Sequence, residues 1–232
     1  TIQADGVSLS NNDAGTSNTI FGKDAGLSLD AGSNYNVFIG EDVSDAAMND
    51  AVENVGVGYQ ALSGLTTGDR NTVIGYQAGI AVNTGTNNTI IGRTAGTTAT
   101  TSSGSVFIGD GAGEGVSTGN RNIAIGQNAM VATTTGDNNV AIGAFAGDAL
   151  TDGFNNVAIG KEAFTRGTTS SENVAIGNNA LGQNTYTSSG SVAIGYFALG
   201  DASSGATNVG IGYRAGKSIL TGYNNVIIGR DA

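Results

Sequence analysis

The chain of 232 residues contains no cysteine, histidine, proline or tryptophan. Without Cys or His it cannot form a thiolate or imidazole metal site, a cysteine nucleophile or a Ser-His-Asp triad. Disulfides are excluded too, so cysteine usage carries no information on redox compartment. Paired carboxylates such as Asp148 and Asp152 are the groups that glycoside hydrolysis uses, but they form no unique constellation. We therefore predict a protein that is not an enzyme and has no catalytic, cofactor or metal site.

Charge and long apolar runs are also scarce. Only 12% of the residues are charged, the net charge is −10, and the nine Lys and Arg residues are scattered singly. A nucleic-acid partner is not expected, because it would require a basic patch. The apolar runs are too short for a membrane span, so we predict no membrane insertion. The chain begins at Thr1 with no visible signal peptide, which suggests a fragment or a processed product.

Glycine, with 39 residues, marks an internal repeat. One glycine serves as the origin of each of thirteen units, and the other positions are counted from it as −1, +1 and so on. Nine of the twelve spacings are 17 residues and three are 18. The origin glycines are Gly22, Gly40, Gly58, Gly75, Gly92, Gly109, Gly126, Gly143, Gly160, Gly177, Gly195, Gly212 and Gly229.

Several other positions of the unit are nearly constant. Position −1 is Ile in eleven units, position −4 is Asn in eleven, and position +3 is Ala in twelve. Position −3 is Val, Thr or Ile. A short apolar stretch between Asn and Gly predicts a β-strand, and 17 residues suit one coil of a parallel β-solenoid. We therefore expect an all-β solenoid of about thirteen stacked coils.

The same pattern predicts which side chains lie inside a coil. Positions −3 and −1, two residues apart, are expected to point inward, which would also bury Thr19, Thr72 and Thr89 and leave no outward Thr array for binding ice. The Ala at +3 and a weaker apolar position at +7 should close the other sides. The Asn at −4 should form a ladder of amide hydrogen bonds from coil to coil. A glycine at −7 in eight units, for example Gly68, predicts a turn with positive φ.

Position −2, between the two residues expected inside, is never polar. A strand that is apolar on both faces is buried on both faces, and one coil cannot cover the second face. We therefore expect this stripe to be the interface of a homotrimer, with its six consecutive small residues close to the symmetry axis; packing on another domain of the same chain is the alternative. The predicted interface residues are Ile20, Phe38, Val73, Ile90, Phe107, Ala124, Ala141, Ala158, Ala175, Ala193, Gly210 and Ile227.

The repeat resembles two families of trimeric fibrous proteins. Residues 71–79 (Asn-Thr-Val-Ile-Gly-Tyr-Gln-Ala-Gly) and 55–62, joined by Thr-Thr-Gly loops, resemble phage tail-fibre shaft repeats. Residues 156–160 (Asn-Val-Ala-Ile-Gly) and 191–195 (Ser-Val-Ala-Ile-Gly) are similar to the head repeats of trimeric autotransporter (YadA-like) adhesins. The resemblance covers residues 18–232 and implies a left-handed β-roll in an intertwined or side-by-side homotrimer. Residues 1–17 are expected to be a degenerate first coil or a lead-in from an upstream segment.

The resemblance implies an extracellular location, on a virion tail fibre or a bacterial surface. The 17-residue period is longer than the repeats usual in adhesin heads, and it therefore favours the tail fibre. In such a fibre this segment would be a structural shaft that supports host attachment and joins further fibre segments at both ends. The alternative is an adhesin head that binds a host receptor, matrix or glycan through its lateral surface. The lateral binding candidates are Tyr59, Tyr76, Tyr196, Tyr213 and Phe197, whose competing interpretation is packing against a neighbouring chain. An acidic group, Glu41, Asp42, Asp45, Asp50 and Glu53, is either a cation site or, as we expect, a solvated loop.

Overall fold

The structure is a computed structural model that describes residues 15, 17–182 and 184–232. The expectation for residues 1–17 therefore lies outside the described residues, apart from Gly15 and Ser17. The described residues form a parallel β-solenoid of three-residue strands and turns, without a helix, and hence without a helical span that would cross a membrane. The chain divides into two compact units, residues 1–118 and 119–232.

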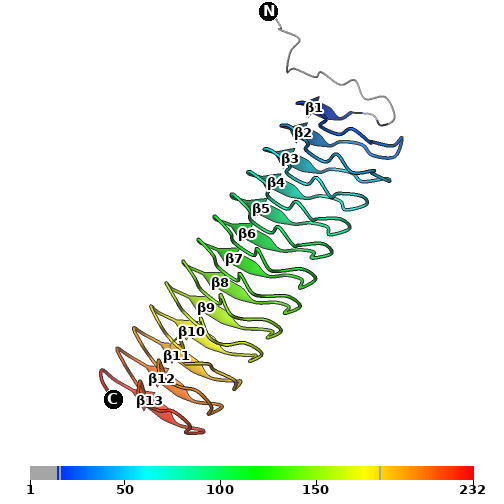
Figure 1. Ribbon diagram of the computed structural model, residues 1–232. Coiled ribbons are helices and arrows are strands. Elements are labelled where there is room, and N and C mark those ends of the chain that lie inside the picture. The colour runs from blue at the N-terminus through cyan, green and yellow to red at the C-terminus, as the bar shows by residue number, and fades with distance from the viewer. Residues whose placement is uncertain (1–14, 16, 183) are drawn as a thin grey trace, which may run out of the picture. The chain divides into compact units, whose positions relative to one another are not determined.

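Each coil contributes one strand, and within a unit the strands stack in chain order, as the ribbon in Figure 1 shows. Strands pair in parallel with equivalent positions in register, for example Ile20 with Phe38 and Ala158 with Ala175. The first unit contains β1 (Thr19–Phe21), β2 (Val37–Ile39), β3 (Val55–Val57), β4 (Thr72–Ile74), β5 (Thr89–Ile91) and β6 (Val106–Ile108). The second contains β7 (Ile123–Ile125), β8 (Val140–Ile142), β9 (Val157–Ile159), β10 (Val174–Ile176), β11 (Val192–Ile194), β12 (Val209–Ile211) and β13 (Val226–Ile228).

The two faces of the strand are the reverse of our prediction. The middle residue, position −2, is buried inside its own coil in every strand except β13, where it is half-buried. Positions −3 and −1 lie on the outside. The residues assigned to a trimer interface therefore form the core instead: Ile20, Phe38, Val73, Ile90, Phe107, Ala124, Ala141, Ala158, Ala175, Ala193 and Gly210 are buried, and Ile227 is half-buried. Period-2 patterning cannot tell inside from outside when both faces are apolar.

The size of the residue at −2 is matched to the residue at +4. Where −2 is large, +4 is usually glycine, as with Phe107 and Gly113, and a Cβ at Gly113 would lie 2.5 Å from the Phe107 ring. Where −2 is small, +4 is often large and fully buried, as with Ala158 and Phe164. Because one side chain is large where the other is small, the two positions fill the same interior space. The small residues at −2 therefore make room for the +4 side chain, and are not a sign of close backbones at a symmetry axis.

The other interior positions are as predicted. The Ala at +3 is buried in every described coil that is followed by another coil. In the second coil this position is Val43, which is also buried. At +7 the side chains of Leu65, Val82 and Val116 are fully buried, whereas Ala47 is exposed and Ile219, near the end of the chain, is half-exposed. These positions close the coil opposite the strand.

The predicted asparagine ladder is present and buried. Asn156 illustrates it: its backbone N–H and its side-chain Nδ2 both donate to Oδ1 of Asn139, at 2.9 and 3.0 Å. Nδ2 also donates to the carbonyl oxygen of Ser170 at 2.9 Å. In turn, Asn156 Oδ1 accepts from the backbone N–H and Nδ2 of Asn173, at 3.0 and 3.2 Å. A buried amide is thus fully paired, as burial demands.

At the eleventh coil, where the ladder asparagine is missing, a tyrosine supplies the hydrogen bond. Ser191 occupies position −4 of the eleventh coil and is too short to reach the next coil's Gly205 carbonyl. The fully buried Tyr186 takes over: its hydroxyl contacts Ser191 Oγ at 2.6 Å and the Gly205 oxygen at 3.0 Å. Burial raises the pKa of the Tyr186 hydroxyl, so it remains a neutral donor. No simple rule on position −4 predicts this tyrosine.

Glycine is required at two positions for different reasons. The origin glycines have φ between 129° and 144°, and a Cβ at Gly160 would lie 2.7 Å from the carbonyl of Gly177 in the next coil. The glycine at −7 does not have positive φ, so our turn prediction was wrong there. A Cβ at Gly68 would instead lie 2.3 Å from the Gly85 carbonyl oxygen. Close stacking of backbones, not φ, excludes a side chain at −7.

Candidate functional site

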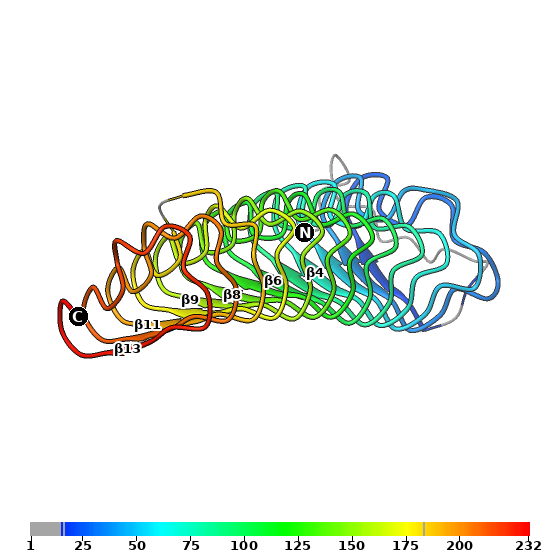
Figure 2. The ribbon, with the colours of Figure 1, turned by 90° about the horizontal axis from the view of Figure 1, so that it is seen from below.

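The outer face of the strands is the most extensive candidate surface of each unit. It carries two columns of side chains, at positions −3 and −1, and Figure 2 shows the strands of each unit along one side with the turns opposite. All but four of the 26 residues in the two columns are Val or Ile; the others are Thr19, Phe21, Thr72 and Thr89.

These columns are incompletely covered by their own chain. Side chains at −1 such as Ile39, Ile74 and Ile142 are 38%, 38% and 36% exposed. The three Thr residues of the −3 column point outward, contrary to our prediction, but they are interspersed with Val and form no regular Thr array. A regular band of half-exposed β-branched apolar side chains is characteristic of an interaction surface.

The outward position +1 forms a ladder of matched pairs on adjacent coils. The Nζ of Lys23 lies 2.9 Å from a carboxylate oxygen of Glu41, and Arg93 lies 2.9 Å from Asp110. Tyr59 stacks on Tyr76 in the same column, with ring centroids 5.3 Å apart. The four charged side chains are 40–66% exposed, so each ion pair contributes at most about 1 kcal/mol. The residue type at +1 varies along the chain, but in these three pairs the residues on adjacent coils are matched to one another.

The predicted lateral binding residues fall into two separate clusters. Tyr196 and Tyr213 stack with centroids 5.1 Å apart, and Phe197 meets the edge of Tyr196 at 4.5 Å. Arg214 and Arg230 lie 5.0 and 5.3 Å from the Tyr213 ring centroid. The Tyr rings are 38–51% exposed, but in each pair one face is already occupied by the neighbouring ring. An incoming sugar would have only the outer faces and edges available.

The acidic group is dispersed. Among the described residues, no three His, Cys, Asp or Glu side chains come together in a group that could hold a metal ion. Burial raises the pKa of Asp45, and the charges of Asp42 and Asp24 raise it further.

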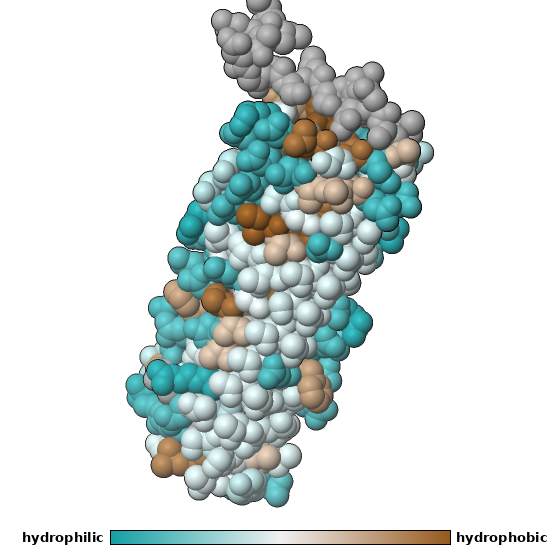
Figure 3. All heavy atoms as spheres, turned by 45° about the vertical axis from the view of Figure 1, so that its right-hand side comes forward, coloured by the Kyte–Doolittle hydropathy of each residue, from teal (hydrophilic) through white to brown (hydrophobic). Residues whose placement is uncertain are grey.

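The face drawn in Figure 3 is mainly of intermediate hydropathy, with hydrophilic residues along both margins and hydrophobic residues as separate spots.

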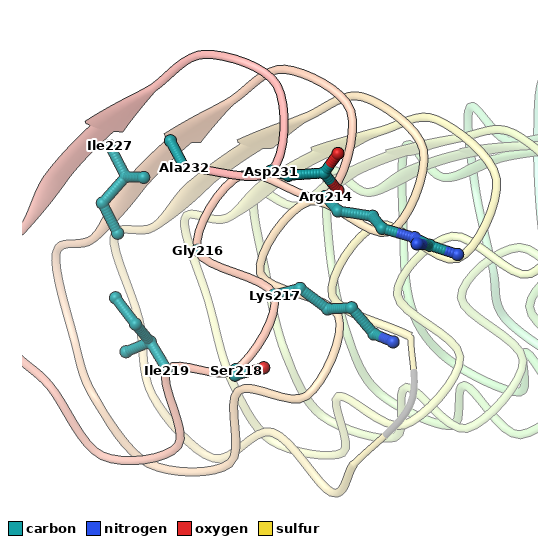
Figure 4. Close-up of a pocket in the computed structure, with 8 residues that line it drawn as sticks. All are labelled: Arg214, Gly216, Lys217, Ser218, Ile219, Ile227, Asp231 and Ala232. Atoms are coloured by element: carbon teal, nitrogen blue, oxygen red, sulfur yellow. The ribbon is translucent and has the colours of Figure 1, made fainter.

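A pocket of about 510 Å³ opens at the last coil. Figure 4 shows Ile219 and Ile227 facing one another across it, while the side chains of Arg214 and Lys217 point away from them. Ile219 and Ile227 occupy the +7 and −2 positions that form the interior of the preceding coils. The pocket is thus the open end of the coil interior at the last coil.

Comparison with known proteins adds no relative. No family model, curated protein or solved structure matches the chain. What the protein does is therefore inferred from its own residues and their arrangement.

Proposed function

We propose that this protein is the structural shaft of an extracellular homotrimeric fibre, of the tail-fibre kind that its repeats resemble. The observation that carries the proposal is the pair of half-exposed Val and Ile columns on the outer face of the strands. Strands apolar on both faces are normally covered on both. Three copies related by a three-fold axis would cover these columns with one another and leave the polar turns in solvent.

The way the coils are joined in the interior supports a structural rather than a catalytic role for this segment. Within each unit, neighbouring coils are tied together by in-register strand pairing and, at most positions, by the buried Asn ladder. The outward positions +1 and +2, in contrast, change from coil to coil and present no repeated receptor footprint. Such a segment would provide length and stiffness to an attachment structure.

Light scattering on the purified chain tests the assembly. We expect a mass of about three times 22.9 kDa. Replacing both Ile142 and Ile176 by Asp is expected to yield monomers, because two charges per chain would be desolvated at the interface without a partner. Lys161→Asp, in an exposed turn, is the control and should remain trimeric. A stable wild-type monomer, or a double variant that still forms trimers, would contradict the proposal.

The alternative function is a lateral adhesin, which the exposed Tyr196–Tyr213 stack and its neighbouring Arg214 favour. If that is the role, the trimer should bind host cells saturably, and Tyr196→Ala should abolish that binding while the trimer persists. Tyr223→Ala, which changes another exposed tyrosine, is the control. Absence of cell binding by the wild-type trimer, measured with labelled protein, favours the passive shaft.

A further inference from the structure

A cationic cluster lies on the lateral surface of the second unit, beside the stacked tyrosines, and consists of Arg214, Lys217 and Arg230. The two guanidinium groups lie 5.0 and 5.3 Å from the centroid of the Tyr213 ring, and the Nζ of Lys217 lies 5.4 Å from that of Phe197. Figure 4 shows the side chains of Arg214 and Lys217 extending in the same direction from the turns of the twelfth coil. Three of the chain's nine Lys and Arg residues are thus gathered at the outward positions +1, +2 and +5 of two coils.

The cationic cluster has too few counter-charges. Asp231 lies 3.4 Å from Arg230, but neither Arg214 nor Lys217 forms an ion pair with any of the residues that the structure describes. Contact with an aromatic ring stabilises a cation, yet it leaves the N–H donors available to carboxylate oxygens, which are their strongest acceptors. The cluster is therefore suited to a partner that carries several carboxylates.

Such a group of carboxylates is present at the same repeat positions of the first unit. This acidic patch consists of Asp24 and Asp42 at +2, Asp45 at +5 and Glu41 at +1. Burial raises the pKa of Asp45, and the charges of Asp42 and Asp24 raise it further, so these carboxyls lie close enough to repel one another. Lys23, 3.7 Å from Asp24 and 2.9 Å from Glu41, supplies one positive charge against four negative ones.

We propose that the cationic cluster of one copy of the chain binds the acidic patch of another copy. Like charges repel within each group, and contact between the two groups replaces repulsion by attraction on both sides. The contact is heterologous, so each copy keeps one free group of either sign and association continues into chains of copies. Such a contact would join shafts to one another, and it does not rest on the trimer, because each group belongs to a single chain.

The distribution of charge along the chain favours a second copy as the partner. Residues 1–118 contain 3 Lys and Arg against 12 Asp and Glu, a net charge of −9, whereas residues 119–232 contain 6 against 7, a net charge of −1. A first unit therefore attracts the cationic cluster of a second unit more than another second unit does. An acidic polysaccharide would also fit the cluster, but it would leave the repulsion within the acidic patch in place.

Sedimentation velocity of the whole chain measures the contact. At about 0.1 M salt, charges further apart than about 10 Å are screened, so the net charge of −10 no longer keeps copies apart, while groups in contact still attract. We expect species larger than the basic assembly under these conditions, and their loss at about 1 M salt, where the screening length is about 3 Å. The basic assembly, one chain or three, is measured at the higher salt concentration, so failure of this contact is distinct from failure of the trimer.

Reversal of the charge of either group should remove the larger species. Arg214→Glu with Lys217→Glu leaves two acidic groups, and Asp24→Lys with Asp42→Lys leaves two basic ones. Each double variant should associate about tenfold or more weakly than the wild type. An equimolar mixture of the two should associate again, because each variant offers the charge that the other has lost, and an unfolded variant could not do so.

Arg121→Glu with Lys161→Glu is the matched control. It changes the net charge by the same amount at two cations outside the cluster, and should associate as the wild type does.

The proposal is wrong if the wild type forms no larger species at about 0.1 M salt and chain concentrations up to about 1 mM. It is equally wrong if the larger species survive both charge reversals, or if the mixture of the two variants fails to associate. Alginate, a polymer of uronic acids, is the probe for the other occupant. Alginate binding that is lost in the Arg214 and Lys217 variant, without self-association of the wild type, would assign the cluster to an acidic polysaccharide.

Discussion

Replacing Asn156 by leucine is expected to lower the stability of the second unit by several kcal/mol. Leucine has a similar volume but no polar atoms, so the Ser170 carbonyl and the backbone N–H of Asn173 lose their partner inside the coil. Asn173 Nδ2 loses one acceptor and keeps the carbonyls of Ser171 and Ser188. Each buried polar group left unpaired costs about 1–3 kcal/mol. Thermal melting followed by circular dichroism, at one fixed protein concentration, measures the loss.

The matched control is Asn225→Leu, the same change at the last ladder position. Asn225 donates twice to Asn208 Oδ1 and is only part-buried. Its replacement should therefore cost less than half as much as the Asn156 change. Equal melting temperatures for the two variants would mean that the ladder is not a main source of stability.

Gly160→Ala is expected to lower the stability of the second unit by several kcal/mol. The φ of Gly160 is 129°, outside the range that alanine adopts easily, and the added Cβ would lie 2.7 Å from both atoms of the Gly177 carbonyl. Backbone strain and overpacking each cost about 1–3 kcal/mol, and here they coincide. We expect a drop in melting temperature of about 5 °C or more, since about 1 kcal/mol corresponds to 2–4 °C in a chain of this size.

Gly190→Ala provides the comparison. Gly190 also has positive φ, at 76°, but a Cβ there would meet only Thr207 Cγ2, at 3.4 Å. Other coils carry non-glycine residues with positive φ at this position, for example Asn155 and Glu172. The change should cost about 1 kcal/mol. A Gly160 variant that melts with the Gly190 variant would show that neighbouring coils can separate to admit a methyl group.

Periodicity made much of this fold predictable. Because one unit recurs at a nearly constant spacing, the strand, the buried Ala at +3 and the Asn ladder could be assigned without knowledge of any contact. The faces of the strand could not be assigned in this way, since Val and Ile flank an equally apolar middle residue. A usable signal was nevertheless present: Phe107 with Gly113, against Ala158 with Phe164, shows that positions −2 and +4 compensate in volume.

The candidate sites were less predictable. The ring pairs at Tyr59–Tyr76 and Tyr196–Tyr213 were visible as equal residues one coil apart, and they do stack. A hollow of about 580 Å³ in the surface of the second unit, beside Asp148, was not foreseen, because its lining depends on small residues at +5 and +6 of neighbouring coils rather than on a motif. In the sequence, Asp148 stood out only as half of a carboxylate pair with Asp152. In the structure, Asp152 instead accepts hydrogen bonds from the hydroxyls of Thr134 and Thr135.

The matched pairs at position +1 bear on how such a protein changes length during evolution. Strands β8 to β11 all read Val-Ala-Ile, so a coil gained or lost there, for example residues 161–177, would leave equivalent strands in contact. The same event between Tyr59 and Tyr76, or between Arg93 and Asp110, would separate partners that fit only each other. Inheritable changes in length should therefore come in whole coils of about 4.8 Å, and should accumulate in the stretch where neighbours are interchangeable.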